Sequence, residues 1–267
     1  MWKLKALLRS LTKKILPLFA FRGRKRISAM MRVRNEEQFI EAAILSIIDH
    51  VDEVVIIDNM SDDQTPKIIS RLADKYPGKI RALVYPHKVA RYGEENRKLA
   101  STSKGRRSPA LLSNFYNWCV AQCQYPFILK WDGDTVATNE FGVEMEKFRT
   151  ARAQSLWHTG VNLHENRTCL ISGRPFEDME PRLFPRTLSK YDNGLGYCEE
   201  LKSPFIHGED NIYVDRCETP LYVHMKFCKV DKFSNMSEDI QERERQNNQV
   251  GQVADQNIIE TVAKWNL

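Results

Sequence analysis

Apolar runs of strand length alternate with segments of helical spacing in the first third of the chain. Three runs are suited to buried strands: residues 27–33, 54–57 and 80–84. The interval after the first run begins with Asn35, which is typical of a helix N-cap, and continues with apolar residues at helical spacing. The interval after the second run begins with Thr65 and Pro66, a favoured helix start. This alternation predicts an α/β fold with a mostly parallel central sheet and helices on both faces.

The rest of the chain carries the same patterns less regularly. Helices are predicted at 110–123 and 141–151, and strands at 128–131, 155–163 and 220–226. The polar, basic stretch 86–109 predicts a long loop, which in a compact domain is usually either functional or disordered. Ser237 is placed to cap a helix in the polar region that follows. We therefore predict a single catalytic domain at 27–230, an N-terminal arm at 1–26 and a polar helical tail at 231–267.

Charged side chains follow the predicted strands at the point where each strand ends. Arg34 follows the first strand, Asp58 ends the second, and Asp132 and Asp134 flank Gly133 after a later one. Ligands of a parallel sheet bind beyond the carboxyl ends of its strands, so these side chains should share one cleft. Mg²⁺ and Mn²⁺ are usually held by one or two carboxylates together with substrate phosphates. The glycine allows a turn tight enough for both carboxylates to face one site.

Three motifs, in this order, resemble the inverting glycosyltransferases of family 2, which have the GT-A fold. They are Val33-Arg34-Asn35-Glu36-Glu37, the stretch from Val51 to Thr65, and Lys130-Trp131-Asp132-Gly133-Asp134. The likeness is greatest to bacterial enzymes that build lipopolysaccharide core, capsule and other surface glycans, and it is best over residues 27 to 135. It implies transfer of a sugar from a UDP-, GDP- or dTDP-linked donor to a hydroxyl of a glycan or lipid-linked acceptor, with Mn²⁺ or Mg²⁺ as the cofactor.

The resemblance also assigns roles to individual residues. Asp58 becomes the nucleoside contact, while Asp132 and Asp134 become the ribose and metal ligands. His224 ends a short late strand and takes the place of a further metal ligand, a role that imidazole can fill. The remaining residues predicted on the donor side are Arg34, Glu36, Arg106 and Arg182. The role of Arg182 stays open, because Pro185 interrupts the Arg-Leu-Phe-Arg-Arg pattern of the family.

Inverting transfer needs a carboxylate that takes the proton of the acceptor hydroxyl as its oxygen attacks the anomeric carbon. The resemblance places this acid within residues 196–201, where Cys198 stands at the position of the family's histidine. Glu199 is the nearer match in register and Glu200 is an alternative. Asp210 is a third candidate, since other family-2 enzymes use a Glu-Asp pair.

The net charge of +5 is unevenly distributed along the chain. Residues 1–26 carry nine Lys and Arg residues and no acid, which leaves 31 basic against 35 acidic residues in the remainder. A slightly acidic body argues against a nucleic-acid partner. In the arm, leucines at helical spacing are interleaved with lysines, a pattern typical of a helix lying on an anionic membrane surface. A helix docked on the domain is the alternative.

The sequence also bears on the cellular compartment. No apolar run reaches the length of a transmembrane helix, and basic residues interrupt every apolar stretch suited to a secretory signal. The six cysteines form no Cys-x-x-Cys pair, which predicts reduced thiols. Together these features predict a cytoplasmic protein that lies at the inner face of the membrane.

One other enzyme class fits the acid pair taken alone. Asp132-Gly133-Asp134-Thr135-Val136 also resembles the loop of haloacid-dehalogenase-like phosphatases, in which Asp132 would be the nucleophile. That loop normally follows the first strand of its fold, whereas three predicted strands precede it here. The glycosyltransferase hypothesis therefore explains more of the chain.

Overall fold

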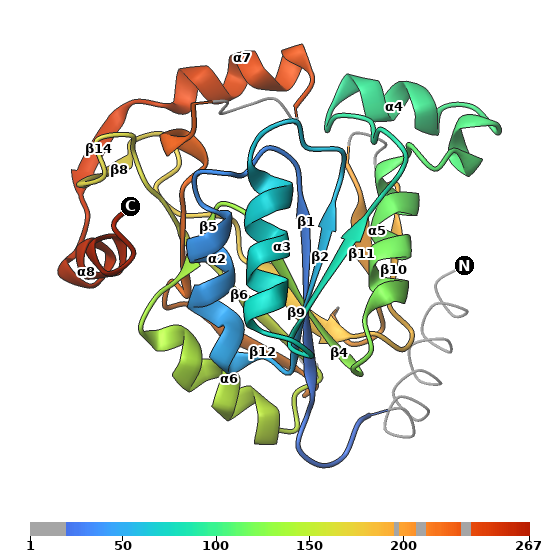
Figure 1. Cartoon of the computed structure of the whole chain (residues 1–267), viewed down its shortest axis with the longest axis horizontal. Helices are drawn as coiled ribbons and strands as arrows, with labels where there is room; N and C mark the ends of the chain where they lie inside the picture. Colours follow the sequence, from blue (N-terminus) through green and yellow to red (C-terminus); the bar gives the residue numbers. More distant parts are fainter. Residues whose placement is uncertain (1–19, 195–197, 207–211, 231–235) are drawn as a thin grey trace, which may run out of the picture.

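The computed structural model describes residues 20–194, 198–206, 212–230 and 236–267 of the chain (Figure 1). Its centre is a seven-stranded sheet in the order β12-β6-β9-β4-β1-β2-β3. These strands are β1 (Ile27–Val33), β2 (Glu53–Asp58), β3 (Ile80–Val84), β4 (Phe127–Asp132), β6 (Ser155–His158), β9 (Glu180–Pro185) and β12 (Val214–Cys217). All neighbours pair in parallel except β9, which is antiparallel to both β4 and β6. The predicted mostly parallel α/β fold is confirmed.

Helices cover both faces of the sheet (Figure 1). α2 (Ile40–Ile47), α3 (Thr65–Lys75) and α6 (Glu140–Thr150) pack on one face, and α5 (Leu112–Gln122) packs on the other. Successive residues of β1 serve the two faces, since Ala29 and Met31 join the first apolar cluster whereas Met30 joins the second, with Phe115 of α5. Burial on both faces explains why β1 and β2 read as continuous apolar runs.

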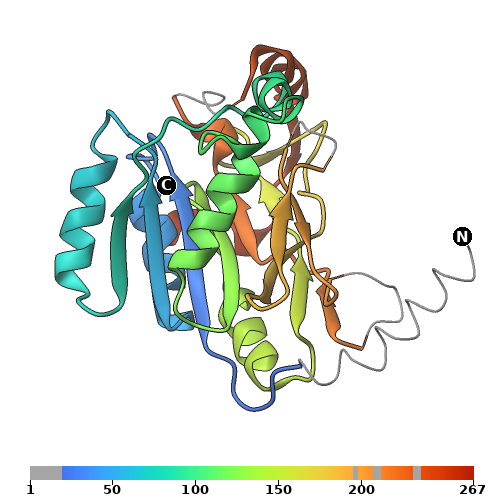
Figure 2. The same ribbon diagram turned by 90° about the vertical axis from the view of Figure 1, so that its right-hand side faces the viewer.

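Smaller sheets flank the carboxyl ends of the central strands. β5 (Thr135–Ala137), β13 (Tyr222–His224) and β7 (Val161–Asn162) form a three-stranded sheet, while β10 (Lys190–Asp192) pairs with β11 (Glu200–Lys202) and β14 (Val250–Val253) with β8 (Cys169–Ile171). Ile258 of α8 (Gln256–Lys264) shares an apolar cluster with Val223 of β13. α7 (Glu238–Asn247) lies with α4 (Glu94–Ala100) above the central strands, at the top of both views (Figures 1 and 2).

Two local predictions about the region after β1 and β3 were wrong. The helix expected to begin at Asn35 begins at Ile40. Asn35 instead adopts a φ of 56°, its backbone N–H donates to Ser61 Oγ (2.9 Å), and its Oδ1 accepts from the backbone N–H of Asp62 (3.0 Å). Its polar groups thus join the loops that follow β1 and β2. The loop expected at 86–109 contains α4 and a single 3₁₀ turn.

The strand expected at 155–163 is divided into β6 and β7 at Gly160. A Cβ atom at this position would lie 2.2 Å from the ring of Tyr222, so the approach of β13 requires a glycine here. Farther along, α7 begins directly after Ser237, as predicted.

The chain just before β1 is packed onto the domain. Lys25 is 1 % exposed, and its Nζ donates to the carbonyl oxygens of Phe148 (2.9 Å) and Ala151 (2.5 Å) at the end of α6. The ring of Phe21 contacts that of Phe127 edge-on. Residues 20–26 of the expected arm therefore belong structurally to the body, and residues 1–19 lie outside the described residues. Within the described part of the chain, no helix is long and apolar enough to cross a bilayer.

Candidate active site

The carboxyl ends of β1, β2 and β4 meet at one edge of the sheet. In the strand register, Val33 lies opposite Asp58, and Arg32 lies opposite Asp132. Gly133 then turns the chain so close to the loop after β1 that a Cβ on it would lie 2.8 Å from Cγ of Glu36. A glycine is therefore needed at the centre of the acid pair, because it lets the pair approach Glu36.

A cleft of about 680 Å³ opens beside this turn. Seven residues predicted for the site line it: Arg34, Glu36, Asp132, Asp134, Glu199, Glu200 and His224. They come from the ends of β1, β4 and β13 and from the start of β11. The fold thus brings together side chains that lie as much as 190 positions apart in the sequence.

Three residues predicted on the donor side do not line this cleft. Asp58 is buried, and its carboxylate accepts hydrogen bonds from the backbone N–H and the hydroxyl of Ser61. Arg106 lies on the exposed 3₁₀ turn and donates to the carbonyl of Ala100 (3.1 Å). Arg182 is buried beneath the acid pair. Their contacts with a donor stay predictions.

Asp132 is held by two arginines. Its Oδ1 lies 2.9 Å from a guanidinium nitrogen of Arg32, and its Oδ2 lies 2.9 Å from one of Arg182. Burial on its own would raise the pKa of this carboxyl, but Arg182, Lys130 and Arg32 hold that pKa well below its usual range. Asp132 is therefore a fixed anion with both oxygens engaged, an arrangement that suits an oriented hydrogen-bond acceptor better than a free nucleophile.

Asp134 begins a chain of charged groups that crosses the cleft. Its Oδ1 lies 3.4 Å from Nε2 of His224, and Nδ1 of His224 lies 3.0 Å from Oε1 of Glu177. Burial would lower the pKa of His224, but the two carboxylates raise it to about 9. Glu177 lies between β8 and β9. The sequence analysis missed it, because no local pattern marks an acid that acts through a histidine 47 positions away.

The other oxygen of Asp134 contacts a lysine that the sequence analysis also missed. Nζ of Lys229 lies 2.8 Å from Asp134 Oδ2 and 2.8 Å from Glu36 Oε1. Burial would lower the pKa of this amine, but Asp134 and Glu36 raise it well above its usual range. Burial and the neighbouring Asp134 raise the pKa of Glu36 in turn. Glu36 Oε2 is buried and has no hydrogen-bond partner among the described residues.

Asp134 of the acid pair and His224 can together hold a divalent cation. Among the described residues, no three His, Cys, Asp or Glu side chains converge as a complete metal site. Asp134 and His224 nevertheless present an oxygen and a nitrogen 3.4 Å apart, close enough for one ion to bind both. Glu177 engages the second nitrogen of His224, as carboxylates commonly do behind a metal-binding histidine. These residues fit Mn²⁺ or Mg²⁺ that completes its coordination with substrate phosphates.

The three acids predicted as the base differ in their surroundings. Glu199 lines the cleft and is partly buried, and this burial raises the pKa of its carboxyl. Glu200 is exposed at the edge of β11 and forms an ion pair with Lys202. Asp210 lies outside the described residues.

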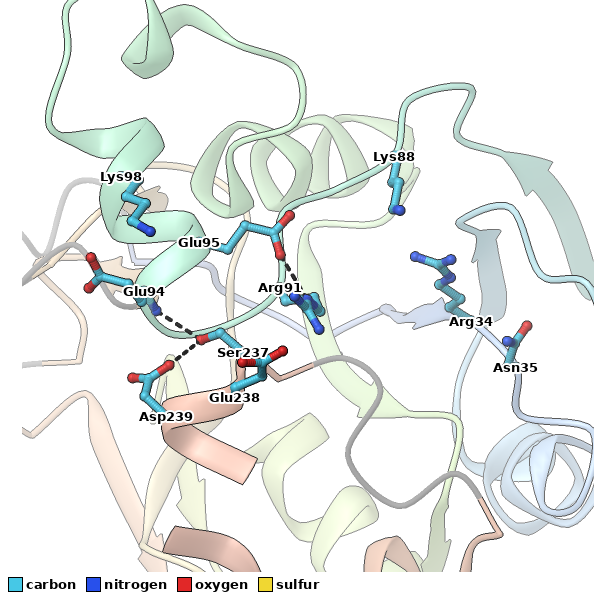
Figure 3. A pocket seen from close by; sticks show the side chains of 10 residues that line it. All are labelled: Arg34, Asn35, Lys88, Arg91, Glu94, Glu95, Lys98, Ser237, Glu238 and Asp239. Carbon is cyan, nitrogen blue, oxygen red and sulfur yellow. Dashed lines mark hydrogen bonds and ion pairs between the residues drawn. The ribbon is translucent and has the colours of Figure 1, made fainter. Parts of the chain in front are cut away.

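A second cleft of about 830 Å³ adjoins the first, and Arg34 and Arg91 line both (Figure 3). Lys88 and Arg34 lie on one side of this cleft (Figure 3). Acidic side chains of α4 and α7 lie on the other side, where Arg91 is paired with Glu95 (2.8 Å). The two helices are joined at Ser237, whose Oγ accepts from the backbone N–H of Glu94 (2.8 Å). The sequence analysis did not foresee that α7 helps to build the site.

The first part of the chain matches a known family. Residues 28–101 match the family model described as Glycosyl transferase family 2. This match runs from β1 into the segment after α4 and ends before the acid pair. Over these residues it confirms the predicted resemblance to family-2 glycosyltransferases. No curated protein matches the chain.

Similar crystal structures include those of two named proteins. S. aureus TarS 1-349 is 14 % identical, with a TM-score of 0.46, over 75 % of this chain and 60 % of that one. The same TarS fragment in complex with UDP is 12 % identical, with a TM-score of 0.47, over 81 % of this chain and 68 % of that one. Glucosyl-3-phosphoglycerate synthase from Mycobacterium tuberculosis, in complex with Mn²⁺, UDP and phosphoglyceric acid, is 13 % identical, with a TM-score of 0.43, over 75 % of this chain and 70 % of that one. The chain thus spans less than two thirds of the first of these structures.

Proposed function

We propose that this protein is an inverting glycosyltransferase of surface-polysaccharide biosynthesis. It moves a sugar from a nucleotide-diphosphate-sugar donor to a hydroxyl group of a glycan or lipid-linked acceptor. The observation that carries the proposal is the acid pair at the end of β4, which opens into the same cleft as Glu199 and His224. A leaving diphosphate needs a nearby cation, and an attacking hydroxyl needs a base. The residues of this cleft can bind the cation and can act as the base.

In this proposal the donor is a UDP-, GDP- or dTDP-linked sugar. Asp134 and His224 would hold Mn²⁺ or Mg²⁺, and the ion when bound would neutralise charge on the leaving diphosphate. Asp132, fixed by its two arginines, is oriented to accept a hydrogen bond from a ribose hydroxyl. The side of the adjoining cleft that carries Arg34 and Lys88 suits the negative charge of a nucleotide.

We assign the general base to Glu199 in preference to Glu200. Both side chains line the cleft, but the carboxylate of Glu200 is engaged by Lys202 at an exposed edge. The burial of Glu199 raises the pKa of its carboxyl, which strengthens it as a base near neutral pH. Asp210 remains the third candidate.

The donor assignment is tested by a thermal-shift screen of nucleotides and nucleotide-sugars, with Mn²⁺ or with EDTA. The wild-type protein should be stabilised by at least one nucleoside diphosphate more strongly with Mn²⁺ than with EDTA. Asp134→Ala should abolish this Mn²⁺-dependent increase, whereas Asp74→Ala, at an exposed position on α3, should retain it. Equal Mn²⁺ dependence in both variants would refute the metal assignment. If a phosphate ester instead phosphorylated Asp132, the alternative hypothesis of a haloacid-dehalogenase-like phosphatase would be correct.

We further propose that the enzyme lies at the inner face of the membrane, where a lipid-linked acceptor would be held. The support for this is the sequence of the arm, in which positive charges are interleaved with leucines. Binding to the surface that carries the acceptor raises the effective concentration of that acceptor.

A further inference from the structure

We propose that Lys229 is a built-in cation of the diphosphate site, which lets the protein bind a nucleoside diphosphate before any metal ion is present. This inference rests on the proposed function, because it concerns how the same donor is held. It adds a positively charged side chain that acts beside the ion predicted at Asp134 and His224.

The position of Lys229 supports a direct contact with ligand. Its Nζ bridges Asp134 and Glu36, each at 2.8 Å, and the residue lines the cleft that contains the acid pair. An ammonium group has three N–H donors, and these two carboxylates accept two of them. Among the described residues no acceptor takes the third. A phosphate oxygen entering the cleft can therefore become the third partner of this amine.

The backbone around Lys229 is fixed, which distinguishes it from an ordinary surface lysine. Before it, the backbone N–H of Cys228 donates to the carbonyl of Met225 (2.9 Å), and Phe227 is buried. After it, the backbone N–H of Val230 donates to Oε1 of Gln38 (3.0 Å). These backbone contacts and the two ion pairs together hold the ammonium beside the acid pair before a ligand arrives, so little conformational entropy remains to be lost when a diphosphate binds.

Charge complementarity points in the same direction. Asp134, Glu36 and Glu177 place three carboxylates within one network, and Lys229 is the lysine that contacts two of them. Without Lys229, Asp134 and Glu36 would face an incoming diphosphate with His224 as the remaining positive partner of Asp134. Mn²⁺ and Lys229 would share Asp134 as a neighbour, so removing the lysine should weaken diphosphate binding and strengthen Mn²⁺ binding.

The test measures binding of UDP and GDP by calorimetry in EDTA and in Mn²⁺, with no activity assay. Lys229→Met alone would leave the buried Glu36 without a cation and Asp134 with His224 alone, a change large enough to unfold the protein. The decisive pair is therefore Glu36→Gln and the double variant Glu36→Gln/Lys229→Met, which differ only in the lysine. Lys147→Met, on the exposed side of α6 and paired with Glu144, is the control for the loss of a lysine elsewhere.

In EDTA, the wild type and Lys147→Met should bind the better of the two nucleotides equally well, and Glu36→Gln sets the reference affinity for the double variant. The double variant should bind this nucleotide at least about tenfold more weakly than Glu36→Gln does. Such a loss corresponds to one hydrogen bond to a charged group. Titration with Mn²⁺ alone should show tighter Mn²⁺ binding to the double variant than to Glu36→Gln.

Equal affinity of Glu36→Gln and the double variant for the nucleotide in EDTA would overturn the role of Lys229. Nucleotide binding that occurs only with Mn²⁺ would overturn it too, yet leave the proposed function intact. Failure of both nucleotides to bind under either condition would count against the proposed function itself.

Discussion

Replacement of Arg182 separates a structural role from a contact with the donor. Its guanidinium lies 2.9 Å from Asp132 Oδ2 and 2.7 Å from Glu180 Oε1, and it stacks over the ring of Tyr222 at 4.4 Å. The side chain is only 3 % exposed. These contacts place Arg182 beneath the site as the cation that fixes Asp132, so Arg182→Met should lower the stability of the whole protein.

The size of the effect follows from what remains after the change. Removing one partner of a buried ion pair costs roughly 3–5 kcal/mol. Here Asp132 keeps Arg32 at 2.9 Å, and Glu180 keeps Lys130 at 3.1 Å. Neither carboxylate is left alone, so we expect the lower end of that range, about 3 kcal/mol. For a chain of this size the melting temperature should fall by about 6–12 °C.

Urea unfolding of Arg182→Met, followed by circular dichroism, measures the loss directly. Arg186→Met, at the residue directly after β9, is the matched control, because its exposed side chain donates to the carbonyl of Cys123. It should change the free energy of unfolding by about 1 kcal/mol or less. An Arg182→Met variant with wild-type stability and lost nucleotide binding would refute this reasoning and make Arg182 a donor contact.

Three further predictions concern the base, a buried histidine and the arm. Glu199→Gln should lower kcat about 10²–10⁴-fold with the donor affinity unchanged, and wild-type kcat should rise with pH through the raised pKa of Glu199, since the base must be ionised. Full activity of Glu199→Gln together with an inactive Glu200→Gln would move the base to Glu200, and full activity of both variants would move it to Asp210. Burial lowers the pKa of His158 to about 3, so between about pH 6.5 and pH 3 the unfolded chain binds up to one more proton than the folded chain. In this interval His158 should lower the free energy of unfolding by up to about 1.4 kcal/mol for each pH unit of acidification, and His158→Asn should remove that part of the slope in acid titrations of stability. Deleting residues 1–19, and keeping the packed segment from residue 20, should reduce sedimentation with anionic liposomes, and high salt should weaken binding of the full chain. Unchanged sedimentation with the liposomes after the deletion would contradict the proposal that the arm binds the membrane.

The first strands and the acid turn could be predicted because their signals are local. β1, β2 and β4 are buried on both faces, so each appears in the sequence as a short apolar run that ends at a charged residue. The helix start at Asn35 could not be predicted in the same way. Its polar groups are taken by Ser61 and Asp62, which belong to another loop.

The partners of the acid pair depend on contacts between distant segments. Lys229 reaches Glu36 across 193 positions, and Glu177 reaches His224 across 47. Neither pair has a spacing that a helix or strand would reveal. The part of the second cleft that α7 forms could not be predicted either, because it depends on a contact between Ser237 and the start of α4. The sequence therefore predicts the charged residues at the strand ends but not the distant residues that hold them in place.

The most direct test of the proposed function is a crystal soaked with MnCl₂ and the nucleotide-sugar that stabilises the protein most, examined by anomalous scattering. The proposal predicts one manganese peak bound by Asp134 and His224, with the donor diphosphate completing its coordination and the transferred sugar on the side of Glu199. A nucleotide bound away from the end of β4, or manganese at other residues in its presence, would contradict the proposal.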